Sequence, residues 1–270
     1  MLPILSTDFW QSEFCFFLAK IDFKLYNEKK RFPPTARKRI AGAVWLWSAF
    51  FHLQKMEVIT MFEIKVIATR GGVPLRAAKG HFATNHSHIN YFIDITTQKT
   101  RLAEAKAVAK ELAAKFSNTR VDTILCLDGM TLVGACLADA LCQGRHPAAN
   151  ADEIAVIEPE YNSYNQMTFR DNVQNYVREK NVLVLMASIS TGFTAKRGIQ
   201  GTKYYGGNVV GVAGLFRAVD HLEYRDVKLV SVFEPADLPD YRSFDHNDCP
   251  FCRDGRKLDA LVNSHGYSKL

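Results

Sequence analysis

The stretch that decides the fold lies at residues 181–194 and reads NVLVLMASISTGFT. The apolar residues 182–185 predict a buried strand, and a turn of small hydroxyl residues and a glycine then leads into a helical pattern. This arrangement would bring backbone N–H groups and hydroxyls to a helix N-terminus at Ser190, Thr191, Gly192 and Thr194. Such an end favours an anion such as phosphate. The alternative is an ordinary capped helix start, because Ser and Thr are common caps.

Strand and helix patterns alternate on both sides of this stretch, from Met61 onward. Runs of strand length lie at residues 121–127, 154–157, 182–185, 209–212 and 228–233. Helical patterns lie at residues 100–116, 131–142 and 194–205, with Thr100 as the expected cap of the first and Gly206 and Gly207 as the stop of the last. This alternation predicts an α/β fold with a mostly parallel, doubly wound sheet. Ligands of such sheets bind at the carboxyl ends of the strands, so the turns there are the candidate sites.

The composition is that of an ordinary globular protein, with 47% hydrophobic and 23% charged residues. Six cysteines without a secretory signal indicate reduced thiols in a cytosol. The longest strongly apolar run, residues 41–53, is too short to span a bilayer as a helix. We therefore expect a cytoplasmic protein that is not bound to a membrane.

The net charge of +6 is concentrated at one end of the chain. Residues 1–60 contribute +4 of it and all three tryptophans. A basic patch for nucleic acid on the remainder is therefore not indicated.

Residues 1–60 show no clear strand–helix alternation, and three interpretations stay open. They form a membrane-surface segment, a packed N-terminal subdomain, or an artefact of the gene model upstream of a true start at Met56 or Met61. We favour the third, because the recognisable domain begins just after Met61. The expected domains are thus an extension at residues 1–60 and an α/β domain at residues 61–270.

Residues 181–194 resemble the signature of type I phosphoribosyltransferases, in which a hydrophobic strand leads to two acidic residues and a Thr-Thr-Gly-x-Thr loop. In that family the loop holds the 5′-phosphate of phosphoribosyl diphosphate. The resemblance implies a phosphate-binding role for the matching residues Ser190, Thr191, Gly192, Phe193 and Thr194.

Other stretches resemble the orotate phosphoribosyltransferases of that family, and they come in the family's order from Gly80 to Gly255. Residues 80–82 read GHF and are followed by Ser87, His88 and Tyr91, while residues 204–212 match a helix end and the next strand. Residues 249–255 match a Cys-Pro-x-Cys-x-x-Gly stretch near the carboxyl terminus. The family's diphosphate-binding loop falls on Leu127, Asp128, Gly129 and Met130.

The resemblance implies a type I phosphoribosyltransferase-like parallel sheet flanked by helices, with a small hood built from the residues before about Arg101 and the C-terminal tail. It implies transfer of ribose 5-phosphate from phosphoribosyl diphosphate to a base such as orotate, with Mg²⁺, by a homodimer. Asp128 is then the candidate catalytic residue, and no residue is assigned as a metal ligand. The alternative is a protein that binds a nucleoside monophosphate without turnover, as a sensor or regulator.

The family's two acidic residues, which bind the ribose hydroxyls, fall on Met186 and Ala187. Neither side chain accepts a hydrogen bond from a hydroxyl. Hydrogen bonds to a charged group contribute about 1.5–3 kcal/mol each, so the loss of two costs roughly 3–6 kcal/mol. This break favours the non-catalytic alternative.

The family's mobile loop also departs from the pattern, because the comparable residues 157–165 contain no Lys or Arg. The leaving diphosphate normally needs cations and Mg²⁺. One hypothesis is a rebuilt site, in which Asp128, Glu158 or Glu160 holds a metal and Arg170 meets phosphate. Asp128 is equally explained as a turn residue beside Gly129.

Cys249 and Cys252 are spaced like half of a zinc site, with His246 three residues upstream. The alternative is a turn with two free thiols, since the other cysteines of the domain fall in predicted core elements. His81, His86 and His88 are irregularly spaced, and the resemblance favours a loop at the domain's edge for them over metal ligation.

Overall fold

The computed structural model describes residues 62–143, 153–164 and 166–270. They belong to one compact unit, Phe62–Leu270. The expectations for residues 1–60 lie outside the described residues and stay predictions. Within the described ranges, no helix is long and apolar enough to cross a membrane.

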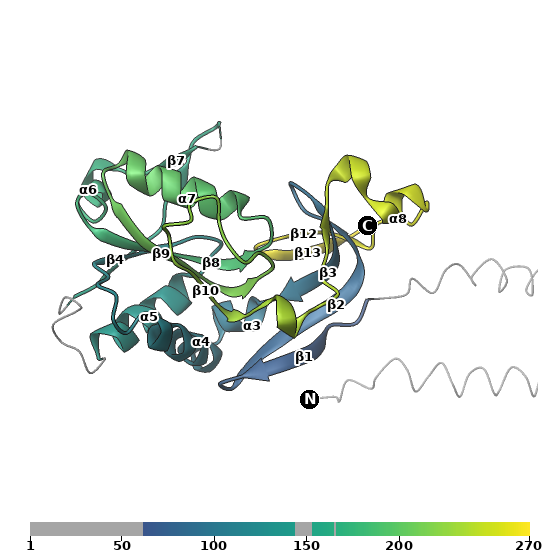
Figure 1. Cartoon of the computed structure of the whole chain (residues 1–270), viewed down its shortest axis with the longest axis horizontal. Helices are drawn as coiled ribbons and strands as arrows, with labels where there is room; N and C mark the ends of the chain where they lie inside the picture. Colours follow the sequence, from purple (N-terminus) through teal and green to yellow (C-terminus); the bar gives the residue numbers. More distant parts are fainter. Residues whose placement is uncertain (1–61, 144–152, 165) are drawn as a thin grey trace, which may run out of the picture. The chain divides into compact units, whose positions relative to one another are not determined.

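The centre of the unit is a five-stranded parallel sheet in the order β10-β9-β8-β4-β5 (Figure 1). Its strands are β4 (Thr123–Cys126), β5 (Ala155–Ile157), β8 (Asn181–Ile189), β9 (Asn208–Arg217) and β10 (Leu229–Phe233). Each contains or overlaps one of the five predicted runs, so the α/β prediction is confirmed. β8 and β9 continue four and five residues beyond the predicted runs 182–185 and 209–212.

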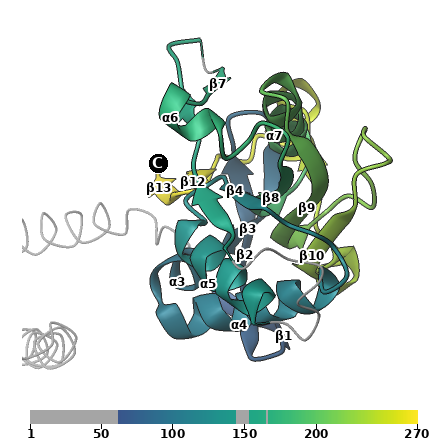
Figure 2. The ribbon, with the colours of Figure 1, turned by 90° about the vertical axis from the view of Figure 1, so that its left-hand side faces the viewer.

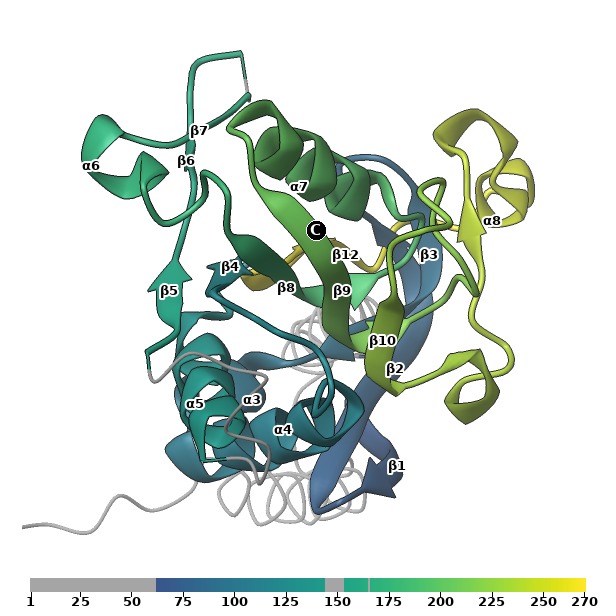
Figure 3. The same cartoon turned by 60° about the vertical axis from the view of Figure 1, so that its left-hand side comes forward.

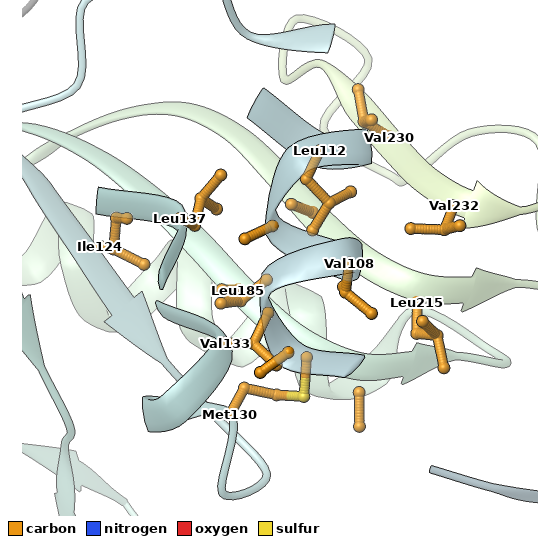
Figure 4. Packing of buried hydrophobic residues seen from close by; sticks show 14 of the residues in the cluster. Val108, Leu112, Ile124, Met130, Val133, Leu137, Leu185, Leu215, Val230 and Val232 are labelled. Carbon is orange, nitrogen blue, oxygen red and sulfur yellow. The ribbon is translucent and has the colours of Figure 1, made fainter. Parts of the chain in front are cut away.

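Helices cover both faces of this sheet, with α4 (Leu102–Lys115) and α5 (Thr131–Cys142) on one side and α7 (Phe193–Tyr204) on the other (Figures 2 and 3). Side chains of β8 alternate between the two layers, as a strand buried on both faces requires. Leu183 and Leu185 pack in the α4–α5 layer, and Val184 packs in the α7 layer. Figure 4 shows Leu185 beside Val108 of α4 and Val133 of α5.

The predicted helix at residues 100–116 is wrong at its start. Thr100 ends a separate short helix, α3 (Thr96–Thr100), and its hydroxyl donates to the carbonyl of Thr96 at 2.8 Å. Arg101, in an extended conformation, precedes α4 instead. Leu102, the first residue of α4, is 54% exposed.

A second sheet forms the expected hood beside the parallel sheet (Figure 1). Its strands are β1 (Lys65–Arg70), β2 (Val73–Ala83), β3 (His88–Asp94), β11 (Ser243–Phe244), β12 (Ala260–Asn263) and β13 (Gly266–Lys269). The order β11-β3-β2-β12-β13, with β1 also on β2, joins the beginning of the unit to its end. The Arg70 guanidinium holds hood and sheet together, donating to the carbonyl of Val232 at 2.8 Å and pairing with Asp237 at 3.0 Å.

The remaining elements are short and lie in the connections. They are β6 (Glu160–Tyr161), β7 (Met167–Thr168), α6 (Asp171–Gln174), α8 (Pro250–Arg253) and the 3-10 turns η2 (Pro235–Asp237) and η3 (His246–Asp248).

Candidate functional site

The sheet reverses its winding between β4 and β8, which are parallel neighbours. β4 leads into α5 on one face and β8 leads into α7 on the other, so the two following turns open side by side. A cleft of about 230 Å³ lies between these turns and the hood. It is lined by Asp128 and by four residues of the 190–194 loop, of which Ser190, Thr191 and Thr194 carry hydroxyls.

The 190–194 loop makes one wall of the cleft. Gly192 is the residue before α7 and has a φ of +80°, a conformation that costs other residues energy. The first N–H groups of a helix have no partner within it, and that of Phe193 donates to the Thr191 hydroxyl at 3.4 Å. Ser190 hydrogen bonds the buried phenol of Tyr241. The Phe193 ring lies 4.7 Å from the His86 ring, which brings the hood against the loop.

Asp128 stands at the opposite wall, directly after β4. Its φ of +57° and that of Gly129, +71°, put two successive residues in the left-handed region. Strain at a non-glycine residue is concentrated at functional sites in proteins. Of the four predicted diphosphate-loop residues, Asp128 lines the cleft, whereas Leu127 and Met130 are 2% and 1% exposed in the core.

The carboxylate of Asp128 is held in a partly buried, polar setting. Its Oδ2 accepts from the backbone N–H of Ala187 at 3.4 Å. Burial raises the pKa of Asp128, and the Ala187 N–H, Lys99 and His265 offset part of that rise. The group is therefore suited to hold or exchange a proton more readily than an exposed carboxylate.

Lys99 is a cation of the site that the sequence reasoning missed. Its ammonium group, on α3, donates to the backbone carbonyls of Asp128 and Ser264. Burial lowers the pKa of Lys99, and the charge of Asp128 opposes that shift. The pattern Asp94-Ile95-Thr96 could have indicated the helix that carries Lys99, because the Asp94 carboxylate accepts from the N–H of Thr96 at 3.0 Å.

Met186 and Ala187 differ in where their side chains lie. Met186 is 2% exposed and packs in the layer beneath α7. Ala187, one residue later in the strand, is also 2% exposed and packs in the α4–α5 layer, but it borders the cleft. Both side chains are therefore buried, and only the second position is adjacent to the ligand space.

The rebuilt-site hypothesis is wrong for Glu160 and Arg170. These two residues, on either side of the β6–β7 hairpin, pair with each other at 2.6 Å, and neither lines the cleft. Glu158 accepts from the hydroxyl of Thr131 at the start of α5. The Arg197 guanidinium lies 5.7 Å from the ring of Tyr161, a residue whose pKa is raised by burial and then by the charge of Asp128, but neither Arg197 nor Tyr161 lines the cleft.

The histidine and cysteine predictions need a correction. His81 is fully buried within β2 and His88 begins β3, so they do not lie in an edge loop; His86 lies in the turn between those strands. The ligand atoms of His81, His88, Cys249 and Cys252 all lie within 4.8 Å of one another. His246 is outside this set, and its ring packs 4.9 Å from that of His88.

No protein-family model matches this chain, and no curated protein matches it. Solved structures that are similar to it are type I phosphoribosyltransferases. The orotate phosphoribosyltransferase of Mycobacterium tuberculosis in complex with inorganic phosphate is 18% identical over 56% of this chain and 82% of the enzyme, with a TM-score of 0.41. The adenine phosphoribosyltransferase of Trypanosoma brucei in complex with AMP, pyrophosphate and ribose-5-phosphate is 13% identical over 70% of this chain and 91% of the enzyme, with a TM-score of 0.42. The UMP synthase of Leishmania donovani is 12% identical over 73% of this chain and 37% of that protein, with a TM-score of 0.41.

Proposed function

We propose that the cleft binds a phosphoribosyl ligand, either phosphoribosyl diphosphate or a nucleoside monophosphate, and that its activity is transfer of ribose 5-phosphate to a base. The observation that carries the proposal is that two turns able to bind anions open on one cleft. One is the 190–194 loop before α7, and the other is the turn of Asp128 before α5. A ligand with a phosphate at each end fits two such turns.

The 5′-phosphate is assigned to the loop before α7. Ser190, Thr191 and Thr194, which carry hydroxyls, line the cleft there, and the first turn of the helix has no acidic residue. The helix dipole and unpaired N–H groups stabilise a negative charge at that end. The sequence resemblance to the phosphate loop of type I phosphoribosyltransferases assigns the same role to the same residues.

The diphosphate or its equivalent is assigned to the turn of Asp128. One cation lies beside this turn, because Lys99 donates to the carbonyl of Asp128, although its side chain does not line the cleft. It offsets in part the lack of Lys and Arg in residues 157–165. Positive groups at this end would stabilise the charge that develops on a diphosphate leaving group.

Asp128 places a carboxylate near positions 186 and 187, which carry Met and Ala in this chain. Its side chain reaches the backbone of Ala187, so a carboxylate stands beside the strand although residues 186 and 187 have none. We assign to it the hydrogen bonds to the ribose or the proton transfer at the base. Mg²⁺ is bound in such sites by one or two carboxylates together with the phosphates of the substrate. Asp94 and Asp128 line the cleft and suit this role; the ion would neutralise the diphosphate.

The second candidate function is binding of a nucleoside monophosphate without turnover, for sensing or regulation. The apolar pair Met186 and Ala187 favours it, because the ribose hydroxyls lose two charged partners. Orotate remains the base that the sequence resemblance suggests for the catalytic reading.

Calorimetric titration of the full chain separates these functions. The chain is titrated with phosphoribosyl diphosphate and Mg²⁺, then with orotidine 5′-monophosphate, and diphosphate release is assayed with orotate and with adenine. Micromolar binding of the diphosphate with release supports transfer. Binding of the monophosphate alone supports the non-catalytic function, and failure of both ligands to bind overturns the proposal.

A further inference from the structure

We propose that His81, His88, Cys249 and Cys252 bind a structural Zn²⁺ ion in the hood. This site lies outside the cleft and stands independently of the function proposed for it. The four residues come from β2, β3 and the start of α8. The chain separation between His81 and Cys249 is 168 residues, so one ion would join the beginning of the unit to its end.

The distances between the ligand atoms are those of a tetrahedral site. His81 Nε2 lies 3.1 Å from His88 Nδ1, 3.4 Å from Cys249 Sγ and 3.7 Å from Cys252 Sγ, and the last sulfur lies 3.3 Å from His88 Nδ1. With Zn–N bonds of about 2.05 Å and Zn–S bonds of about 2.3 Å, a tetrahedron has edges of about 3.3 Å between nitrogens and about 3.6 Å between nitrogen and sulfur. These four separations fall around those values, and all the ligand atoms lie within 4.8 Å of one another.

The outer contacts of His81 orient it as a metal ligand. Its Nδ1 lies 3.0 Å from the carbonyl of Arg256 and 3.2 Å from that of Lys257, and a carbonyl only accepts hydrogen bonds. Nδ1 therefore carries the proton, and the lone pair of Nε2 faces the cluster. Metal-bound histidines in proteins have this arrangement, with the other ring N–H donated to a carbonyl or carboxylate.

The two cysteines have the local structure of a metal knuckle. Cys249 is 1% exposed and precedes α8, with Pro250 at the first helical position. Cys252 follows within the first turn, so both sulfurs reach the same side. Two thiolates and two imidazoles are a donor set that selects Zn²⁺, and four protein ligands leave no open position for chemistry. A structural role follows from this closed set.

The site also supports one wall of the cleft. The turn at residues 84–87 lies between the two histidine ligands, and it lines the cleft. Within it the hydroxyl of Thr84 accepts from the N–H of Ser87 at 2.9 Å, and the ring of His86 packs on Phe193. An ion that fixes His81 and His88 would fix the ends of this turn.

Metal analysis of the full chain tests the proposal. Protein purified without chelator and with a thiol reductant is expected to contain about one zinc ion per chain. Replacement by Co²⁺ is expected to give the ligand-field bands of a tetrahedral site and a thiolate-to-cobalt charge-transfer band. Absence of that band, or a zinc-loaded wild-type chain that retains no zinc after gel filtration, would overturn the proposal.

Variants identify the ligands by competition with a chromophoric chelator. Loss of an outer-shell partner weakens metal binding about 10–100-fold, so His88→Ala and Cys252→Ser should each weaken zinc binding by at least about 100-fold. The matched control is His246→Ala, which removes the imidazole that packs on His88 but is not in the ligand set. Its affinity should stay within about 10-fold of wild type. If His246→Ala lost as much zinc affinity as His88→Ala, the proposed set of four ligands would be wrong. Circular dichroism of each variant checks that it is folded.

Discussion

The carboxylate of Asp128 accepts a hydrogen bond from the backbone N–H of Ala187 at 3.4 Å, across the boundary between β4 and β8. This contact brings an acidic group to the strand whose own side chains at that level are Met186 and Ala187. It also fixes the orientation of a carboxylate on a residue with a φ of +57°. The residue that we propose to contact the ligand is therefore also the one with a strained backbone conformation.

Asp128→Asn should make the free protein more stable at alkaline pH and weaken ligand binding. Burial raises the pKa of Asp128, so the native state holds its proton more tightly than the unfolded chain does. The stability from that proton is present below the ordinary carboxyl pKa of about 3.9 and is lost as the pH rises through the raised value. Urea unfolding at intervals from pH 4 upward should show a decline for wild type that the variant lacks. Loss of one charged hydrogen bond should weaken phosphoribosyl diphosphate binding about 10–100-fold.

The control for this variant is Asp122→Asn, at the other end of β4. Burial raises the pKa of Asp122, but the hydrogen bonds from Asn181 and Arg120 together lower it by more than burial raises it. The net shift of the pKa is therefore downward. Its stability contribution is present above the ordinary carboxyl pKa and is lost as the pH falls through the lowered value. Asp122→Asn should therefore destabilise the protein at pH 8 and leave ligand affinity unchanged. Equal effects of the two variants on binding would contradict the role of Asp128.

Gly192→Ala should weaken phosphate binding, whereas Gly206→Ala should not. The two glycines stand at opposite ends of α7 with φ values of +80° and +79°, so alanine costs about 1–2 kcal/mol of stability at each. At Gly192 a Cβ would also lie 3.1 Å from Leu222 Cδ2, so either the Leu222 side chain or the loop must give way. Calorimetry with phosphoribosyl diphosphate should show an affinity at least about 10-fold weaker for Gly192→Ala, and no such loss for Gly206→Ala. A similar loss in both variants would mean that general destabilisation, and not the loop, is responsible.

The parallel sheet could be predicted from sequence because its signals are local. Each strand is a short apolar run, and Gly206 marks the end of α7. The sequence did not predict the last residues of β8 and β9, because small residues continue the hydrogen-bonded pairing of these strands. Ser188 pairs with Phe216 in β8 and β9, and neither Ser nor the preceding Ala indicates a strand by itself.

The position of Lys99 and the cluster of two histidines and two cysteines could not be predicted in the same way. Both arise from contacts between segments that are distant in the chain. Lys99 reaches Ser264 across 165 residues, and no spacing near Lys99 reveals that partner. The buried position of His81 depends on pairing between β2, β3 and the C-terminal strands. The sequence alone therefore favoured His246, which is near Cys249 in the chain but outside the cluster.

Acidic residues at positions 186 and 187 should have unequal effects. Met186→Glu places a charge in the layer beneath α7 and should destabilise the protein by at least about 3 kcal/mol. Ala187 is as buried as Met186 but borders the cleft, so Ala187→Asp should cost less stability than Met186→Glu and strengthen phosphoribosyl diphosphate binding about 10-fold through a new partner for the ribose. Ala187→Asn controls for side-chain size. Denaturant unfolding and calorimetry measure both effects, and equal destabilisation by the two acidic substitutions would show that the strand does not present its faces as described.

Removal of zinc should weaken both the hood and the cleft. Without the ion, His81 and His88 no longer fix the turn at residues 84–87, and His86 loses its fixed position against Phe193. A chelator, in the presence of reductant, should lower the Tm and weaken ligand binding by about 10-fold, as loss of a preorganised wall predicts. Zn²⁺ should restore both, whereas Mg²⁺ should not restore the Tm. Cys252→Ser should be insensitive to the chelator; a fall in its Tm equal to that of wild type would show that the chelator acts elsewhere than on the four-residue cluster.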